Sequence, residues 1–427
     1  MALVSELELP AFDYTDASMR GDRFHRAMEE VRARGWLAEG PYGYIALDRE
    51  SAEFFLRTRA AIFPGMKIAE IFGVTEGPLY EQMKRNILHV NGPDHTRLRS
   101  LVNPALSPRA VERYRPAMQV FLRELLERAV GSSLESAGSA GGTVDCEFVE
   151  AFAKPYPSLV IADVMGAPLE DAPKLHHWSN WIQRQFDAGS MASEREGIER
   201  AVEEFYEYAE ALLRTRRESP GDDLISKLIE AEGIDTHPPK LSDVECINLV
   251  FNVLVGGVDT SQSQLAHAIR LLAENPEQWS HLQEEPALAG AAVEEALRYE
   301  PITPFTARIL TEEVSYRDVT FPEGTIVMVC AFTGNRDLEG DESPGAENDR
   351  FDVTAAHRRS DGGPARALTF GAGVHYCLGA NLARLELEEG LAFLATHLKD
   401  LELAGEPEFG TISGIYGLER LPIRFSV

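Results

Sequence analysis

The feature that most constrains this chain is a helical pattern over residues 242–274. Ser242 and Glu245 form a Ser-x-x-Glu capping box at its start, and Asn275-Pro276 marks its end. A helix of this length spans about 50 Å, enough to cross a whole domain. Its apolar run, residues 247–258, is too short for a membrane span, so we predict a buried central helix.

A pair of glycines, Gly256-Gly257, interrupts the middle of this helix. Each glycine inside a helix costs about 1 kcal/mol relative to alanine, so a pair in a buried helix needs a reason. We expect either a kink or the close approach of a large flat group.

The remaining patterns predict a mainly α protein with a small β region. Apolar residues recur at helical spacing in 20–34, 51–58, 108–130, 148–165, 172–186, 192–217, 276–283 and 286–299. Short strands are expected at 43–47, 306–310, 313–316, 325–330 and 420–426. The small-residue stretch 131–143 is interpreted as a surface loop, because helical patterns resume on both sides. We therefore expect residues 1–427 to form a single domain.

Charge and cysteine usage narrow the class of protein. The net charge of -28 opposes nucleic-acid binding, which needs a basic face. The N-terminus lacks the pattern of a secretory signal, and no membrane anchor is expected. The four cysteines, Cys146, Cys246, Cys330 and Cys377, have no zinc-like spacing. We interpret the first three as reduced thiols of a cytoplasmic protein.

Cys377 has unusual surroundings. It lies in the segment FGAGVHYCLG, residues 370–379, in which three glycines allow the backbone to approach a flat cofactor closely. The stretch that follows is strongly helical, so Cys377 precedes a helix N-terminus, where N–H groups favour a thiolate. A thiolate is the ligand that haem iron needs for O–O cleavage. The alternative is a buried structural cysteine in a glycine-rich turn.

The segment from Phe370 to Arg384 resembles the haem-binding loop of the cytochrome P-450 family, of the soluble bacterial type, and the resemblance continues over most of the chain. It implies the cytochrome P-450 fold, in which the long central helix crosses a haem b (iron protoporphyrin IX), with Cys377 as the metal ligand. The cofactor-binding residues that it implies are His95, Arg99, Gly256, Gly257, Arg308, Phe370, Gly371, His375, Cys377 and Gly379.

The segment from Gly256 to Thr260 is similar to the family's oxygen-activation motif. The resemblance implies two catalytic residues: Thr260 would hold a distal hydrogen-bonding network, and Asp259 would help to relay protons. A hydroxyl beside a carboxylate suits the delivery of protons to bound oxygen. The alternative for Thr260 is a hydroxyl that donates to a carbonyl one turn earlier.

Glu295 and Arg298 match the family's Glu-x-x-Arg motif. The resemblance implies a structural ion pair, completed by an arginine from a later loop, for which Arg350 is the candidate. The family's usual proline two residues before that arginine is replaced by Asn348, and the acidic loop before it, 338–349, is longer than usual.

Haem propionates need cationic or hydrogen-bonding partners. His95 and Arg99 resemble the family's pair of propionate ligands, four residues apart on one helical face. Arg308 and His375 match two further usual partners. Each of these, taken singly, is also compatible with a solvated surface charge.

By position in the family, the substrate walls would come from the regions 66–86 and 178–186, from Gly256, and from five further residues. These are Val253, Pro304, Phe305, Ile415 and Tyr416. They are mostly apolar, as in any buried small-molecule pocket, so we expect an apolar or aromatic-containing substrate. Each is equally compatible with a place in the core. Terpenoid, steroid, fatty acid and polyketide all remain open.

The chain has no flavin or iron–sulfur motif, so electrons have to come from a separate protein. Two stretches are locally basic: 95–118 has five arginines and one glutamate, and 353–384 has four arginines and one aspartate. Both flank the thiolate side of the family's fold, and we predict that they dock an acidic ferredoxin served by a ferredoxin reductase. The alternative is a solvated face.

Together these features predict a haem-thiolate monooxygenase that hydroxylates or epoxidises an apolar small organic substrate with O₂. A peroxide-dependent peroxygenase on the same fold is a second possibility, which the Asp259-Thr260 pair disfavours. A non-catalytic haem-based ligand sensor is a third, which the absence of an effector domain disfavours.

Overall fold

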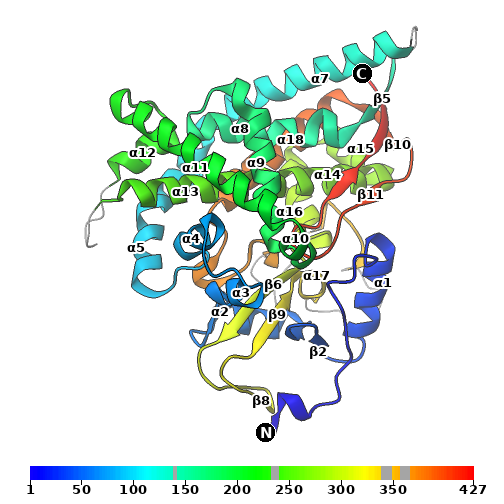
Figure 1. Ribbon diagram of the computed structural model, residues 1–427. Helices are drawn as coiled ribbons and strands as arrows, with labels where there is room; N and C mark the ends of the chain where they lie inside the picture. Colours follow the sequence, from blue (N-terminus) through cyan, green and yellow to red (C-terminus); the bar gives the residue numbers. More distant parts are fainter. Residues whose placement is uncertain (138–141, 232–239, 338–348, 356–365) are drawn as a thin grey trace.

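The computed structural model describes residues 1–137, 142–231, 240–337, 349–355 and 366–427. Most helices lie in one large region, and the largest sheet lies in a smaller region with the N-terminal helices (Figure 1). The mainly α architecture with a small β region is therefore confirmed. Of the predicted acidic loop 338–349, all but the last residue lies outside the described residues.

The predicted central helix exists and is broken near its middle. It consists of α13 (Asp243–Gly257) and α14 (Asp259–Glu274), and Val258 between them has non-ideal helical angles. The capping box is confirmed, because the Ser242 hydroxyl accepts from the Glu245 N–H while the Glu245 carboxylate accepts from the Ser242 N–H. A Cβ at Gly257 would clash with Ile161, so this glycine permits close helix packing.

The central helix is long and apolar enough to cross a membrane, with a mean hydropathy of 1.2 in its most apolar window. However, 67% of that window is buried inside the protein. Helices α13 and α14 both contact α8 (Pro155–Met165) and α9 (Ala172–Gln183). Helix α14 also contacts α16 (Ala289–Tyr299) and α18 (Ala380–His397). The apolar run is thus that of a core helix.

The other helices of the described residues complete the large region and cover the sheet (Figure 1). They are α1 (Gly21–Arg32), α2 (Arg49–Arg57), α3 (Met66–Ile71), α4 (Pro78–Arg85), α5 (Gly92–Val102), α6 (Pro108–Val111), α7 (Arg115–Ala137), α10 (Ala188–Ser193), α11 (Arg195–Glu218), α12 (Leu224–Glu230), α15 (Pro276–Glu284) and α17 (Ala331–Gly334).

The largest sheet has five strands in the order β2-β3-β9-β6-β4. These are β2 (Leu37–Gly40), β3 (Gly43–Ala46), β9 (Ile326–Cys330), β6 (Phe305–Leu310) and β4 (Ala61–Ile62). β3 and β9 run parallel, and the other neighbours run antiparallel. Strand β6 therefore lies inside the sheet, which fixes the side chains that it directs toward the helical region.

Three smaller sheets lie at the periphery. One pairs β10 (Lys399–Leu403), β13 (Pro422–Ser426) and β5 (Thr143–Glu147), with β13 in the middle. A second contains β1 (Ala2–Leu3), β8 (Val319–Phe321) and β7 (Val314–Tyr316), and a third pairs β11 (Glu408–Phe409) with β12 (Leu418–Arg420).

The structure also corrects part of the sequence interpretation. The stretch 131–143 was expected to be a loop, but α7 continues to Ala137 and β5 begins at Thr143. Leucine, glutamate and alanine in residues 134–137 are compatible with a helix, and this local propensity prevails over the run of serines and glycines. Helices α4 and α12 are short, and apolar periodicity alone did not reveal them or α5.

Candidate active site

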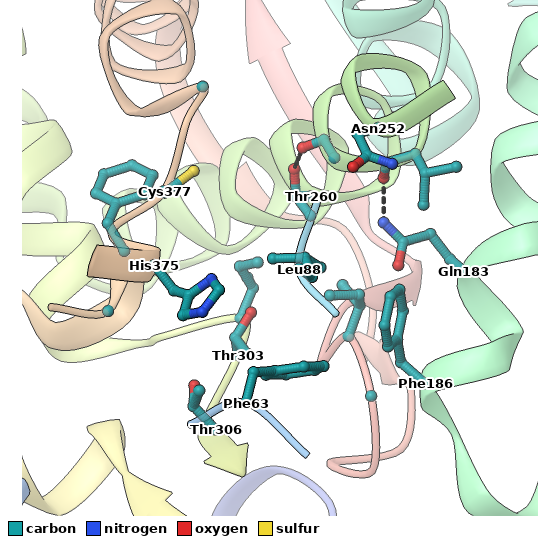
Figure 2. Close-up of a pocket in the computed structure, with 18 of the residues that line it drawn as sticks. Phe63, Leu88, Gln183, Phe186, Asn252, Thr260, Thr303, Thr306, His375 and Cys377 are labelled. Atoms are coloured by element: carbon teal, nitrogen blue, oxygen red, sulfur yellow. Dashed lines mark hydrogen bonds between the residues drawn. The ribbon is translucent and has the colours of Figure 1, made fainter. Parts of the chain in front are cut away.

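A cavity of about 470 Å³ lies between the helical region and the five-stranded sheet. Its wall combines α13, α14, the start of α18, strand β6 and the segment that carries Cys377, and Figure 2 shows part of it. The ten cofactor-binding residues expected from the sequence all line it: His95, Arg99, Gly256, Gly257, Arg308, Phe370, Gly371, His375, Cys377 and Gly379. Thr260 lines it as well.

Main-chain geometry fixes the segment that carries Cys377. Gly371 and Gly373 have positive φ angles of 69° and 73°, which favour glycine. A Cβ at Gly373 would clash with the Leu56 carbonyl oxygen, at the end of α2. The Cys377 N–H donates to the Phe370 carbonyl at 2.9 Å, which closes the loop before α18 begins.

The Cys377 thiol is held in an environment with opposing effects. Burial raises its pKa, whereas the N–H groups of Gly379 and Ala380 and the guanidinium groups of Arg99 and Arg384 favour the thiolate. The N–H groups belong to the start of α18, as expected for a cysteine placed before a helix N-terminus. A bound metal ion would complete the deprotonation of such a thiol.

Four nitrogen-bearing side chains gather at one edge of the cavity: those of His95, Arg99, Arg308 and His375. Arg308 is 3% exposed, and burial lowers its pKa to about 10. Burial, with the nearby charges of His95 and Arg308, lowers the pKa of His375 to about 3. Within the described residues, neither Arg308 nor Arg99 pairs with a carboxylate: Arg308 donates to the Ala307 carbonyl and Arg99 to the Tyr376 carbonyl.

These observations fit a haem. Unpaired buried cations are costly and call for an anionic partner, which two propionates would supply. Cβ atoms added to Gly256, Gly371 and Gly379 would meet no atom within 4 Å, so each of these glycines borders open space. A thiol on the cavity wall, a cationic edge and bare backbone on two sides form a site for a flat, dianionic, sulfur-ligated group.

Thr260 and Asp259 have different surroundings. The Thr260 hydroxyl lies on the cavity wall and donates to the Gly256 carbonyl at 2.5 Å, one turn earlier (Figure 2). The Asp259 carboxylate does not line the cavity and instead accepts from Ser179 at 2.5 Å and from Asn180 at 3.3 Å, both on α9. Burial raises the pKa of Asp259.

Sequence reasoning missed a second acid. Glu386, on α18, is 1% exposed, lines the cavity and accepts from the Ser261 hydroxyl at 2.8 Å. Its other carboxyl oxygen has no partner among the described residues, and burial raises its pKa to about 8. The available signal was its position on the apolar face of α18, where Leu382 and Leu385 are also buried.

The expected ion pair forms, and the described residues of the Arg350 loop contact it through main-chain atoms. Arg298 donates to both carboxylate oxygens of Glu295 at 2.7 Å, and both residues are buried. Arg350 contributes its main-chain carbonyl, which accepts from Arg298 at 2.7 Å, while its side chain is exposed. The Asp352 N–H donates to Glu295 at 2.8 Å.

Three of the five expected substrate-wall residues line the cavity: Val253, Phe305 and Ile415. Pro304 and Tyr416 are buried outside it. Pro304 precedes β6 and its carbonyl accepts from Ala331, and the Tyr416 hydroxyl accepts from the Gly21 N–H at 3.0 Å. Wall residues that the sequence did not single out individually include Phe63, Leu88, Gln183, Phe186, Asn252 and Thr303 (Figure 2).

Four arginines of the predicted basic patch are neutralised within the protein. Arg97 pairs with Glu245, Arg113 with Asp222, Arg115 with Glu112 and Glu389, and Arg384 with Glu294. Arg358 and Arg359 lie outside the described residues. Arg109 and Arg366 are exposed, and neither pairs with a carboxylate of the described chain. The available positive charge is thus smaller than the sequence count suggests.

Comparisons with known proteins agree with this site. The family model described as Cytochrome P450 matches residues 70–408. The luteothin monooxygenase of Streptomyces thioluteus is 33% identical over 98% of this chain and 96% of its own length. The mycinamicin IV hydroxylase/epoxidase of Micromonospora griseorubida is 32% identical over 77% of this chain and 76% of its own.

A solved structure shows the same architecture. The crystal structure of CalO2 is 28% identical, covers 98% of this chain and 99% of its own, and superposes with a TM-score of 0.84. The family match spans both the central helix and the segment around Cys377, and the structural match extends over nearly all of the chain. The chain therefore belongs to the cytochrome P450 family and is an oxidoreductase with a haem-thiolate centre.

Proposed function

We propose that the protein is a monooxygenase, with residues 1–427 acting as one domain, that hydroxylates or epoxidises a neutral, apolar small organic molecule with O₂. The observation that carries the proposal is the half-buried Cys377 thiol on the wall of an apolar cavity with unpaired cations at its edge. The names of the two relatives, a monooxygenase and a hydroxylase/epoxidase, support the same reaction class.

The residues around the cavity are assigned roles by their chemistry. Cys377 would ligate the iron of haem b, and Arg99, Arg308, His95 and His375 would bind its propionates. A bound haem would supply the redox chemistry that activates O₂ for insertion of one oxygen atom into the substrate. The apolar wall excludes bulk water and holds the substrate against this centre.

Protons would reach the cavity through Thr260 and a buried acid. The Thr260 hydroxyl donates its hydrogen to Gly256, so its oxygen can accept a hydrogen bond from a water molecule in the cavity. Glu386 is protonated at neutral pH because its pKa is raised to about 8, and it contacts Ser261, the neighbour of Thr260. Asp259 could contribute only if its side chain left Ser179 and Asn180.

The Thr260 assignment has a direct test. Thr260→Ala should lower the amount of product formed per NAD(P)H consumed, whereas Thr260→Ser retains the hydroxyl and should keep the parent ratio. An unchanged ratio in the alanine variant would remove Thr260 from the proton path.

Electrons would come from a ferredoxin that docks beside the Cys377 segment. Val374 in this segment is 73% exposed, and Arg109 and Arg366 provide exposed positive charge in the flanking elements. Helix α6, which contains Arg109, contacts α18, and Arg366 precedes the segment in the chain. An acidic partner fits this combination of an exposed apolar residue and unpaired arginines. We place this reaction in the cytoplasm.

The test of the proposal is the absorption spectrum of the purified protein after reduction and addition of CO. The expected result is the red-shifted Soret band of a thiolate-ligated haem, which should disappear in Cys377→Ser. A protein isolated without porphyrin, and unable to take it up, would contradict the proposal.

Two alternatives are separated by turnover assays. A peroxygenase would form product with H₂O₂ alone, and a ligand sensor would form none with either H₂O₂ or a ferredoxin system. Product that depends on ferredoxin and O₂ supports the monooxygenase.

A further inference from the structure

Two amide side chains lie on the cavity wall opposite Cys377. Gln183 lies at the end of α9 and Asn252 lies on α13, and Figure 2 shows both on the far side of Thr260 from Cys377. Gln183 is 8% exposed, and both residues line the cavity. Buried amides are costly unless their polar atoms find partners, so this pair requires an explanation.

Backbone hydrogen bonds fix which way each amide points. The Gln183 amide nitrogen donates to the Val255 carbonyl, so its oxygen is the spare atom. The Asn252 oxygen accepts from the Ile87 N–H at 3.0 Å, so its nitrogen is the spare atom. Neither spare atom has a hydrogen-bond partner among the described residues. The wall therefore contains one unused acceptor and one unused donor, and both atoms are buried.

The two spare atoms come from neighbouring positions. Val255, which holds Gln183, is three residues after Asn252 on α13, so both lie on the same helical face. Gln185 and Gln264 also line the cavity with a spare oxygen, but each donates to a carbonyl elsewhere, of Ile182 and Glu300. Of these glutamines, only Gln183 donates to the helix that carries Asn252.

Charge limits what can bind there. The histidine, arginine and carboxyl groups on the wall are few. Four of them lie at the cationic edge: His95, Arg99, Arg308 and His375. The fifth is Glu386, whose raised pKa keeps it neutral at pH 7. None lies on α9 or α13 beside the amide pair. A carboxylate or an ammonium group would find no counter-charge at this end, whereas a neutral group would not need one.

We propose that Gln183 and Asn252 bind a hydroxyl group of the substrate, which donates to the Gln183 oxygen and accepts from the Asn252 nitrogen. The substrate is then a neutral molecule with a hydroxyl at one end and an apolar opposite end, and the apolar end is the one presented to the Cys377 side. The inference rests on the proposed function, because only a haem bound at Cys377 gives this orientation a chemical meaning.

A series of imidazole probes tests the pair without a known substrate. An imidazole nitrogen coordinates haem iron, which anchors one end of the probe, and alkyl spacers from butyl to decyl carry a hydroxyl, a methoxy or a methyl group at the other end. Binding is followed by the shift of the Soret band and by calorimetry. At one spacer length, the hydroxyl probe should bind about tenfold more tightly than both matched probes.

Isosteric variants connect this preference to the two amides. Gln183→Met removes the acceptor and Asn252→Leu removes the donor, and each should abolish the advantage of the hydroxyl probe while the methyl probe binds as in the parent. Thr303→Val removes a hydroxyl elsewhere on the same wall and should leave the preference unchanged. Retention of the parent's haem spectrum identifies the variants that have folded.

The failure of this inference differs from the failure of the proposed function. A protein that binds haem through Cys377 but shows no hydroxyl advantage at any spacer length, or the same advantage for methoxy and hydroxyl, would overturn the amide pair alone. Persistence of the full preference in both Gln183→Met and Asn252→Leu would overturn it too. A protein with no haem-thiolate spectrum would remove the basis of both.

Discussion

The two sides of the cavity are constructed differently. The Cys377 side comes from one contiguous stretch, residues 368–397, whose shape is set by positive φ angles, a closing main-chain hydrogen bond and the start of α18. The opposite wall is assembled from segments far apart in sequence: 63–72, 86–88, 183–188, 252–260, 302–308 and 412–415. The segment around Cys377 is thus shaped locally, whereas the opposite wall depends on tertiary packing.

The largest predicted effect is on the pH dependence of the free energy of unfolding, and it comes from Glu386, the buried acid of the contiguous side. Folding raises the pKa of Glu386 from 4.5 to about 8, so between these values the folded protein keeps a proton that the unfolded chain has lost. This stabilisation is fully present below the lower value and is lost as the pH rises through about 8. Glu386→Gln cannot ionise and should gain stability over the parent as pH rises, by roughly 3–5 kcal/mol near pH 8.

Thermal unfolding of both proteins from about pH 5 to about pH 9 measures this difference. Glu388→Gln is the matched control, because Glu388 lies on the same helix with 42% of its side chain exposed, and no such trend is expected. A stability difference between Glu386→Gln and the parent that stays constant with pH would show that Glu386 is not buried as a neutral acid.

The next effect concerns the backbone of the same side. Gly373→Ala should cost about 2–3 kcal/mol in the free energy of unfolding, because the new methyl group combines a positive φ with a clash against the Leu56 carbonyl. Gly73→Ala has a similar φ of 63° and no atom within 4 Å, so it isolates the cost of φ, about 1 kcal/mol. Equal losses in denaturant unfolding would mean that the loop shifts to relieve the clash.

A substitution of Arg308 tests the wall that is assembled from distant segments. Arg308→Met should weaken haem binding about 10- to 100-fold by removing a charged hydrogen-bond donor for a propionate. It should also stabilise the haem-free protein, because it replaces an unpaired buried cation with an apolar side chain. Haem titration and thermal unfolding of the haem-free protein measure the two effects. Loss of stability in the haem-free variant would reveal a counter-charge for Arg308 in the protein itself.

The smallest effect is expected on the outer surface beside Cys377. Arg109→Glu should slow reduction by an acidic ferredoxin a few-fold at low salt and by less at high salt, because exposed charges act over a screened range. Lys399→Glu, in β10, makes the same charge change in a different element and should leave the rate near that of the parent. Stopped-flow reduction against ionic strength provides the comparison, and equal slopes for the two variants would refute docking at Arg109.

The same contrast explains what could be predicted from sequence. The mainly α fold, the capped and kinked central helix and the cluster around Cys377 follow from local patterns. The direction of Asp259 did not, because one residue along a helix turns a side chain by about 100°, here onto α9. Glu386, Gln183 and Asn252 are polar residues whose roles depend on burial and on partners from other helices, which one sequence does not display.

The pairing of β13 with β5 has a consequence for how the chain reaches its folded state. β5 is made early and β13 late, and β13 is the middle strand that joins β5 to β10. Until β13 emerges from the ribosome, β5 has no neighbouring strand in this sheet, and its open edge is a site for unwanted association between nascent chains. Ribosome-bound chains that stop before Pro422 should thus depend on chaperones more than the finished polypeptide does.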